Sequence, residues 1–387
     1  MDKYKSIKIK LYLFSFFDDF ILIYPLYGLM FADNGISSAG IASLFVIWSA
    51  VAFISEIPAG AIGDRFSRRN VLITAMIIRA IGYSFWLFMP NYAGFATGFI
   101  LWGVKGALTS GTLEALVYDE LANKDKLDDY ARVTGRMKSI GATGDVLACF
   151  CAALLAKDGY STVLVLSVIS VLAAGFALSK IPQTRVVKEL QEGSYLDTIK
   201  EGVRIIFKKP LALYLVVFMS IVAGMGAADE YMNLFLREKG FSNTAIVVLA
   251  GIIFLCGAIA GALAHRLENK KLPLNTALFL WAALLFVASS APKFLAPALL
   301  AVYIMFFFAV EILFNAHLQK HLTDRTRATS ASVGGFTAEL FAVISYLIVG
   351  FGANKVDYAF SFKLIAVSIA VLATFLVLYS RKHKLIV

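Results

Sequence analysis

The sequence predicts an all-helical membrane protein with twelve transmembrane helices in two pseudo-symmetric six-helix bundles, and three observations support this fold class. First, 59% of the 387 residues are hydrophobic and only 16% are charged, whereas about a quarter of residues are charged in soluble domains. Second, many apolar runs reach the roughly 20 residues that a helix needs to cross a hydrocarbon core. Third, one short motif occurs at a corresponding place in each half of the chain.

Apolar runs separated by short polar segments define the twelve predicted spans. The first run is too long for the core of a signal peptide, and no small-residue cleavage site follows it, so we expect it to remain as a membrane helix. The predicted spans are 10–32, 40–62, 71–89, 93–118, 134–156, 160–180, 210–236, 242–264, 272–290, 294–317, 329–352 and 357–380.

The distribution of Lys and Arg predicts the orientation. Basic residues crowd the N-terminus, every second loop and the C-terminal tail, whereas the alternate loops hold few. The loops ADNGISS and NYAG contain none, and the other alternate loops carry Lys157, Arg237, Lys239, Lys293 and Lys355. Because basic residues beside membrane ends resist translocation, the crowded side is cytoplasmic. We therefore expect a multi-pass protein of the inner or plasma membrane with both termini in the cytoplasm. The net charge of +10 follows this topology, so we expect no nucleic-acid partner.

The widest gap between spans predicts the domain organisation. Residues 182–209 are polar overall, but Leu196, Ile199, Val203 and Ile206 recur at helical spacing. We expect a cytoplasmic linker, with an amphipathic helix on the membrane surface, between an N-terminal bundle at 1–181 and a C-terminal bundle at 210–387.

A charged motif in the second cytoplasmic loop appears in both halves. GAIGDRFSRRNV begins at Gly60 and GALAHRLENKKL begins at Gly261. The alignment matches Arg65 with Arg266, while His265 replaces Asp64. The same motif at the same topological place indicates duplicated halves.

The first copy resembles the signature of the major facilitator superfamily, Gly-x-Leu-x-Asp-Arg-x-Gly-Arg-Arg between helices 2 and 3. Five residues fit, and Ile62 and Ser67 depart from the pattern; the matching residues are Gly60, Asp64, Arg65, Arg68 and Arg69. Twelve spans in a 6+6 arrangement extend the resemblance over the whole chain. It implies a secondary transporter that works by alternating access.

The resemblance also implies a cytoplasmic gate made of the five motif residues and Asp119 at the end of helix 4. Gly60 would let a neighbouring helix approach closely, and Asp64 would accept hydrogen bonds at a helix N-terminus. The arginines would pair with acids such as Asp119 and hold the two halves shut. The alternative is that these charges only keep the loop in the cytoplasm.

Helix 1 contains two adjacent acids, Asp18 and Asp19, in the run FFDDFILIYP. An ionisable group at membrane depth is costly and by default marks a functional pathway. Adjacent helical residues diverge by about 100°, so we expect one acid to face a central cavity and the other a neighbouring helix. Two close carboxylates among phenylalanines can carry a proton. The alternative is a structural pair bonded to a Lys or Arg of an adjacent helix.

Helix 4 places Lys105 near mid-membrane, with Thr109 and Thr112 predicted on the same face. In the family, an Arg linked to proton coupling commonly occupies about this place, which implies the same role for Lys105. A role as counter-ion to Asp18 or Asp19 is equally open, and Arg79 in helix 3 is a further candidate partner for a carboxylate.

Four further acids complete the predicted proton-coupling and substrate residues: Asp145 in helix 5, Asp229 and Glu230 in the outer half of helix 7, and Glu339 in helix 11. Phe17, Tyr24, Tyr231 and Phe336 are candidates to line a cavity for an amphipathic ligand. Helix 5 has Gly141 and Gly144 but lacks the Pro of the family's antiporter motif, which leaves the direction of transport open.

The leading prediction is a proton-coupled exporter of a small amphipathic compound or metabolite, and the alternative is an importer of a small anionic solute with Lys105 as counter-charge. An enzyme or channel is the remote alternative. No Walker loop is present, so we expect that ATP is not the energy source. Of the four histidines, His317 and His321 have the spacing of metal ligands, but with Lys320 and Arg325 nearby they indicate a solvated cytoplasmic helix end. Cys149, Cys151 and Cys256 lie within apolar runs and suggest neither a disulfide nor a metal. We expect no cofactor and a monomer in the bilayer, with a small molecule and protons as partners.

Overall fold

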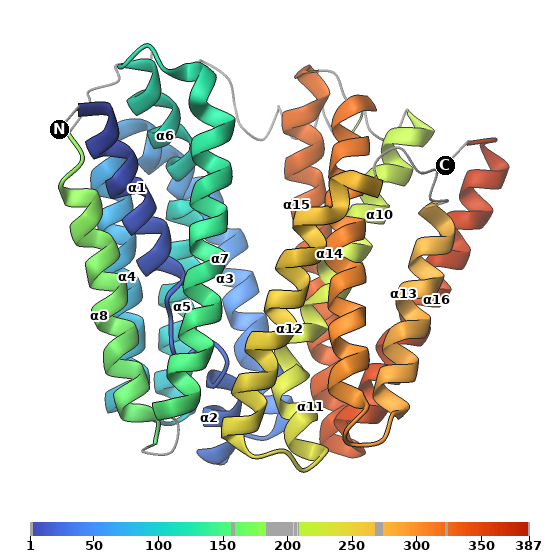
Figure 1. The fold of residues 1–387 in the computed structure, drawn as a ribbon. Coiled ribbons are helices and arrows are strands. Elements are labelled where there is room, and N and C mark those ends of the chain that lie inside the picture. Colours follow the sequence, from blue (N-terminus) through green and yellow to red (C-terminus); the bar gives the residue numbers. More distant parts are fainter. Residues whose placement is uncertain are drawn as a thin grey trace. The chain divides into compact units, whose positions relative to one another are not determined.

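The computed structural model describes residues 3–155, 159–182, 204, 207, 209–267, 274–321 and 324–385. The helices follow one another in the order shown in Figure 1. Their bounds are α1 Lys3–Asp19, α2 Tyr27–Asp33, α3 Ser38–Arg65, α4 Arg68–Phe88, α5 Tyr92–Thr109, α6 Thr112–Ala122, α7 Tyr130–Leu155, α8 Tyr160–Ser179, α10 Pro210–Gly226, α11 Met232–Glu238, α12 Asn243–Leu263, α13 Leu274–Ser290, α14 Ala296–His321, α15 Asp324–Lys355 and α16 Tyr358–Lys382, with short 3-10 turns η1 Leu127–Asp129, η3 Ala227–Tyr231 and η4 Ala264–Leu267.

The helix boundaries follow local sequence signals. Asn91 and Asp357 precede α5 and α16, and their side chains accept hydrogen bonds from the backbone N–H groups of Gly94 at 3.1 Å and Phe360 at 2.5 Å. Such N-caps satisfy donors that have no partner in the first turn of a helix. Pro210 opens α10, where its missing N–H costs nothing.

Nine helices of the described residues are long and apolar enough to cross a membrane. The three predicted spans that are missing from this set are helix 1, helix 4 and helix 9. Helix 9 is present as a shorter apolar helix. Helices 1 and 4 are each divided, because the chain leaves the helical conformation inside the predicted span. The prediction of continuous helices over 10–32 and 93–118 is therefore wrong, whereas the span predicted at 210–236 is present as Pro210–Glu238.

The interruption in helix 1 spans residues 20–26, between α1 and α2. Pro25 lies in it and has no N–H with which to continue the helix. In a membrane, the freed backbone groups need partners inside the protein. Helix α8 supplies them, because Ser170 Oγ donates to the carbonyl oxygen of Phe17 at 2.8 Å and Ser167 Oγ accepts from the N–H of Ile23 at 3.1 Å.

Helix 4 is interrupted for a different reason, and helix 7 changes its helical geometry without ending. Helix 4 is divided at Ser110 and Gly111, and Gly111 has φ +68°, a left-handed conformation that a glycine adopts without strain. Thr112 consequently begins α6 instead of sharing a helix face with Lys105, which corrects that prediction. Helix 7 changes from α10 to the 3-10 turn η3, and this turn contains Asp229 and Glu230.

The described helices form two compact units. The first unit comprises Met1–Ile36, Leu44–Leu190 and Ser242–Gly251, and the second comprises Ser37–Ser43, Gln191–Phe241 and Ile252–Val387. The predicted linker at 182–209, with its amphipathic helix, lies almost entirely outside the described residues. The domain boundaries placed there stay a prediction.

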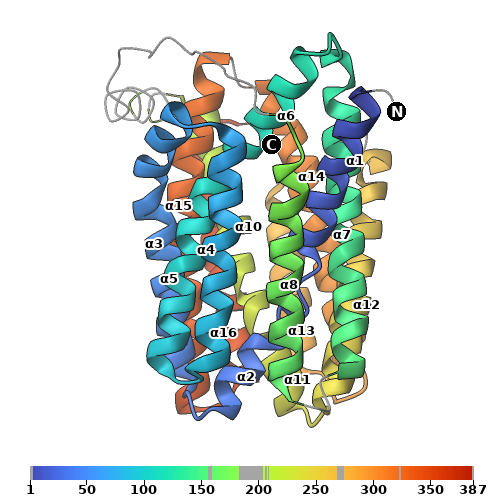
Figure 2. The ribbon, with the colours of Figure 1, turned by 90° about the vertical axis from the view of Figure 1, so that its left-hand side faces the viewer.

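Each unit has its own packing. In the first unit α4 lies between α5 and α8, and α1 lies between α7 and α8 (Figure 2). In the second unit α10 packs on α15, and α13 packs on α14 and α16. Aromatic residues fill the first unit between α2, α3, α4 and α5; Phe31, Trp86 and Phe99 are buried there with their ring centroids 5.2–5.6 Å apart. This packing fixes α4 and α5, the helices that carry Arg79 and Lys105.

Candidate functional site

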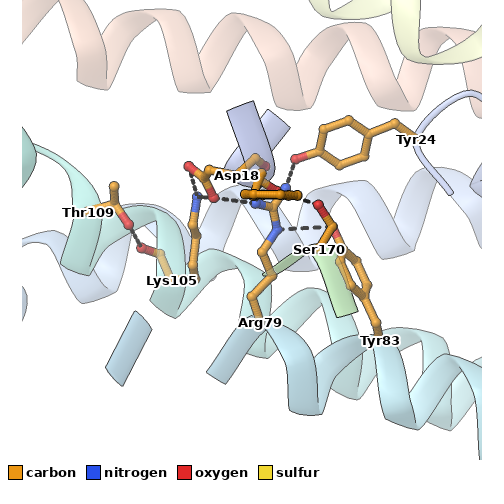
Figure 3. A network of polar contacts seen from close by, with 8 residues as sticks. Asp18, Tyr24, Arg79, Tyr83, Lys105, Thr109 and Ser170 are labelled. Carbon is orange, nitrogen blue, oxygen red and sulfur yellow. Dashed lines mark hydrogen bonds and ion pairs between the residues drawn. The ribbon is translucent and has the colours of Figure 1, made fainter. Parts of the chain in front are cut away.

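Asp18, at the end of α1, is held by two cations from two other helices (Figure 3). Its Oδ1 lies 2.6 Å from Arg79 NH1 of α4 and 3.2 Å from Lys105 Nζ of α5. Lys105 Nζ also donates to Oδ2 at 3.3 Å. The predicted role of Lys105 as a counter-ion to this acidic pair is confirmed, and so is Arg79 as the partner of a carboxylate.

Arg79 also binds the interrupted backbone of helix 1. Its NH1 donates to the carbonyl oxygen of Asp18 at 2.9 Å, a group that lies at the C-terminal end of α1. The last carbonyls of a helix have no intrahelical partner and carry partial negative charge, so they attract a cation. One guanidinium therefore stabilises both the carboxylate and the helix end.

Three aromatic side chains surround the Arg79 guanidinium. Arg79 Nε donates to Tyr83 Oη at 3.0 Å, and NH2 donates to Tyr24 Oη. The carbon of the guanidinium lies 5.2 Å from the ring centroid of Tyr24 and 5.6 Å from that of Trp102, and these two rings stack. Such contacts stabilise a cation away from water. Only 1% of Arg79 is exposed, so its charge is committed to this network.

Several of these partners were not predicted from the sequence. Tyr83 stands four residues after Arg79, a spacing that places both on one helix face and offered a signal. Trp102 stands three residues before Lys105, with the same signal. Ser167 and Ser170 gave no such signal, because a serine in an apolar span is usually interpreted as a small residue that packs between helices.

Asp18 and Asp19 contact different helices, so the two acids diverge as predicted, while a cavity-facing role for one of them stays a prediction. The carboxylate of Asp19 lies against Gly141 of α7, and Gly144 lies against the backbone of Phe16. The absence of side chains at these glycines lets α1 and α7 approach closely. Asp145 follows Gly144 on α7 and interacts electrostatically with Asp19. The first unit thus gathers three acids and two bases.

The predicted acids of helices 7 and 11 belong to the second unit. Asp229 and Glu230 occupy η3 and are half-buried, and Glu339 lies half-buried on α15. Tyr346, which is buried on α15, interacts electrostatically with all three. These acids therefore form a second polar cluster, which belongs to the second unit alone.

The first copy of the repeated motif joins the end of α3 to the start of α4. Arg68 forms an ion pair with Asp119 of α6, and its NH1 donates to the carbonyl oxygen of Ala115 at 2.9 Å. The pairing that the family resemblance implied is present. It joins two helices of the first unit, and a role as a gate between two halves stays a prediction.

Other motif residues differ from the expectation. No described atom lies within 4 Å of the position that a Cβ on Gly60 would occupy, so the close approach predicted there is wrong. It occurs one turn later, where a Cβ on Gly63 would lie 3.3 Å from Thr112 Oγ1. The Arg65 side chain is exposed. The Asp64 side chain lies outside the described part of the structure.

Arg69 has a partner that the gate prediction did not include. Its NH1 donates to the carbonyl oxygen of Ile181 at 2.8 Å, and Lys10 Nζ donates to the carbonyl oxygen of Lys180 at 2.5 Å. Both oxygens lie just beyond the C-terminal end of α8, where cations are favourable. Arg69 therefore stabilises the end of α8 within the first unit.

A helical membrane protein with interrupted helices and charged residues buried at the interruptions has the architecture of a secondary transporter. The family model of the Major Facilitator Superfamily matches residues 11–346, and the chain belongs to this superfamily. The predicted family and fold are confirmed. The chain is a multi-pass membrane transporter and not an enzyme.

Solved structures show the same fold over nearly the whole chain. The nucleoside transporter NupG has a TM-score of 0.78 at 17% identity, covering 98% of this chain and 99% of its own. A bacterial homologue of the human lysosomal transporter Spinster has a TM-score of 0.74 at 15% identity, covering 98% of both chains. A D-xylose-proton symporter has a TM-score of 0.71 at 18% identity, covering 97% of both chains. No curated protein sequence matches the chain.

Proposed function

We propose that this secondary transporter is coupled to protons and exports a small amphipathic compound by alternating access. The observation that carries the proposal is the cluster of three acids and two bases in the first unit. Asp18 is shared by Arg79 and Lys105, while Asp19 and Asp145 repel each other beside it. The cluster holds one more acid than base, so binding a single proton brings it to neutrality and removes the repulsion between like charges.

A proton bound here changes the contacts that hold α1. Asp18 joins α1 to α4 and α5, and Asp19 lies against α7. When the charge of either acid changes, the free energy of these helix contacts changes with it. A ligand or proton shifts a conformational equilibrium only through such a difference between states. The interrupted helix 1 therefore couples protonation to helix arrangement in this proposal.

Import of a small anionic solute is the second candidate. The D-xylose-proton symporter among the structural neighbours favours uptake as a direction. Against an anionic solute stands the contact of Lys105 Nζ with Asp18, since the ammonium that would attract an anion already has a carboxylate 3.2 Å away. We therefore keep export as the first proposal, in a monomer of the cell membrane with both termini cytoplasmic.

Proteoliposomes with an imposed pH gradient test the coupling. Purified protein is reconstituted with an internal pH-sensitive dye, and amphipathic amines and small anions are added in turn on either side. We expect at least one compound to move protons through the wild-type protein, and we expect Asp19→Asn and Asp145→Asn to abolish this movement. Glu56→Gln, which changes an exposed acid of α3, is the matched control. Normal proton movement in both the Asp19 and the Asp145 variants would remove the proposal.

A further inference from the structure

Two buried hydrogen-bond donors of the second unit have no partner among the described residues. They are Nε1 of Trp281 on α13 and the hydroxyl of Tyr303 on α14. Trp281 is 2% exposed and Tyr303 is 1% exposed. A buried donor without a partner costs about 1–3 kcal/mol, so most folded proteins avoid one. Two such donors in one place indicate a group that is not part of this chain.

The two donors belong to one aromatic stack. The rings of Trp281 and Tyr303 are parallel within 7°, with centroids 5.5 Å apart, and the ring of Phe307 lies 5.7 Å from Trp281. Phe307 packs against Gly226, where a Cβ would lie 2.7 Å from the ring. Gly226 is the last residue of α10, so the stack lies directly against the start of η3. Tyr303 and Phe307, four residues apart on α14, both stack on the Trp281 ring, whose N–H is at the ring edge.

The turn η3 places a carboxylate within electrostatic range of Tyr303. Asp229 is half-buried and interacts electrostatically with Tyr303. Backbone N–H groups of Asp229 itself and of Glu230 donate to it. Among the described residues no Lys, Arg or His forms an ion pair with Asp229. A carboxylate at membrane depth needs a counter-charge or a proton. In the first unit the chain itself provides the counter-charge, because Arg79 and Lys105 pair with Asp18.

The three groups need different binding partners, which one solute can supply. The hydroxyl of Tyr303 and the N–H of Trp281 require an acceptor, and the Asp229 carboxylate requires a cation or a donor. A single water would satisfy the two donors but would supply no counter-charge to Asp229 in its ionised form. A solute with an ammonium group and a neighbouring hydroxyl satisfies all three, because its nitrogen donates to the carboxylate and its oxygen accepts from the two donors.

We propose that Asp229, Tyr303 and Trp281 form a binding position for an organic cation whose ammonium group lies next to a hydrogen-bond acceptor, as in an amino alcohol. Asp229 binds the ammonium group, and Tyr303 and Trp281 select solutes that carry the acceptor. The proposal deepens the transport function above by naming a substrate class, and it rests on that function for its physiological meaning. Binding itself is independent of proton coupling.

Binding to purified protein in detergent tests the site with three related probes. The first, 2-amino-1-phenylethanol, carries both groups; 2-phenylethylamine lacks the hydroxyl, and 1-phenylethanol lacks the ammonium. We expect the amino alcohol to bind more tightly than either single-group probe. Tyr303→Phe removes one donor, so its affinity for the amino alcohol should fall by a factor of about ten while its affinity for 2-phenylethylamine is unchanged. Asp229→Asn should abolish binding of both amines.

The matched control is Tyr12→Phe. The hydroxyl of Tyr12 on α1 is also buried without a partner among the described residues, but it belongs to the first unit. This variant should bind the amino alcohol as the wild type does. Without a probe, Tyr303→Phe should unfold at the same or a higher temperature than the wild type, since it loses a donor that had no partner. If Tyr303→Phe does not fold, Trp281→Phe carries the same binding prediction.

Equal affinity of the wild type and the Tyr303→Phe variant for the amino alcohol would overturn the proposal. Ordered water would then be the acceptor for the two donors. The same conclusion follows if none of the three probes binds the wild-type protein. Failure of the proton-coupling proposal has a different signature, because probes would then bind with the predicted selectivity while no pH gradient drives flux. Proton-driven flux of other compounds without amino-alcohol binding would remove only the site.

Discussion

The shared carboxylate of Asp18 gives the most demanding prediction. Asp18→Asn leaves Arg79 and Lys105 with no charge between them, at side-chain exposures of 1% and 11%. Removing one partner of a buried ion pair costs about 3–5 kcal/mol, because the remaining charge is left uncompensated. We expect a loss of this size in the free energy of unfolding, since the asparagine oxygen can accept from only part of the two cations' donors.

Lys105→Met should cost less. Asp18 keeps the Arg79 contact at 2.6 Å, and only the longer contacts of Lys105 Nζ at 3.2 and 3.3 Å are lost. A hydrogen bond to a charged group is worth about 1.5–3 kcal/mol. In the double variant Lys105 is already absent, so Asp18→Asn leaves only Arg79 uncompensated. The cost of Asp18→Asn is therefore smaller than in the wild-type background. The cost of the double variant should therefore be smaller than the sum of the single costs by at least about 1 kcal/mol.

The measurement is unfolding of the purified protein in mixed micelles, followed by helical circular dichroism across a denaturing detergent titration. All four proteins of the cycle are compared under one condition. Additive costs of the two substitutions would show that Asp18 and Lys105 do not share a charge balance. That result would also remove the electrostatic basis of the proton-coupling proposal.

Three further predictions follow from contacts within the first unit. Gly144→Ala should lower stability by about 1–3 kcal/mol through overpacking against α1. Gly135→Ala should leave stability unchanged or raise it by up to about 1 kcal/mol, because alanine favours the helix more than glycine does and a Cβ there has nothing within 4 Å among the described residues. Thermal unfolding of both variants compares them. Arg68→Met should lower the unfolding temperature, and loss of the α4–α6 contact should appear as faster hydrogen exchange in α6. Burial and the hydrogen bond to Asp129 raise the pKa of Tyr4 to about 12. The folded protein thus favours the neutral phenol, so this contact stabilises it at neutral pH. The stabilisation is lost as the pH rises towards 12. Tyr4→Phe should therefore reduce the fall in the free energy of unfolding at alkaline pH.

The sequence predicted where the helices lie better than it predicted where they stop. Long apolar runs determine the spans, and their bounds in the structure agree with the predicted ones within a few residues at most ends. The interruptions in helices 1 and 4 and the 3-10 turn within helix 7 were missed because hydropathy counts side chains and is insensitive to backbone conformation. Pro25 and Gly111 marked the two interruptions, but a proline or glycine inside a membrane helix does not by itself divide it.

The sequence predicted which charged residues belong to the candidate site, and the structure showed how they pair. Buried charges were found because each is expensive in an apolar span, and this reasoning identified Asp18, Lys105 and Arg79. The same reasoning did not predict which charged residues pair, because partners such as Asp18 and Arg79 are 61 residues apart in the chain. It also missed Trp281 and Tyr303, because an aromatic residue in a membrane span is usual and only the fold shows that their polar atoms are buried without partners among the described residues.

The serines that accompany the interruption of helix 1 have a practical consequence for anyone engineering this protein. Ser167 and Ser170 bind the backbone of residues 17 and 23 from a neighbouring helix. Replacing either with alanine would raise the hydropathy of α8, yet it would leave a main-chain group without its hydrogen-bond partner in an apolar environment. Designs for higher expression should keep both hydroxyls and seek added hydrophobicity on the lipid-facing side of α8.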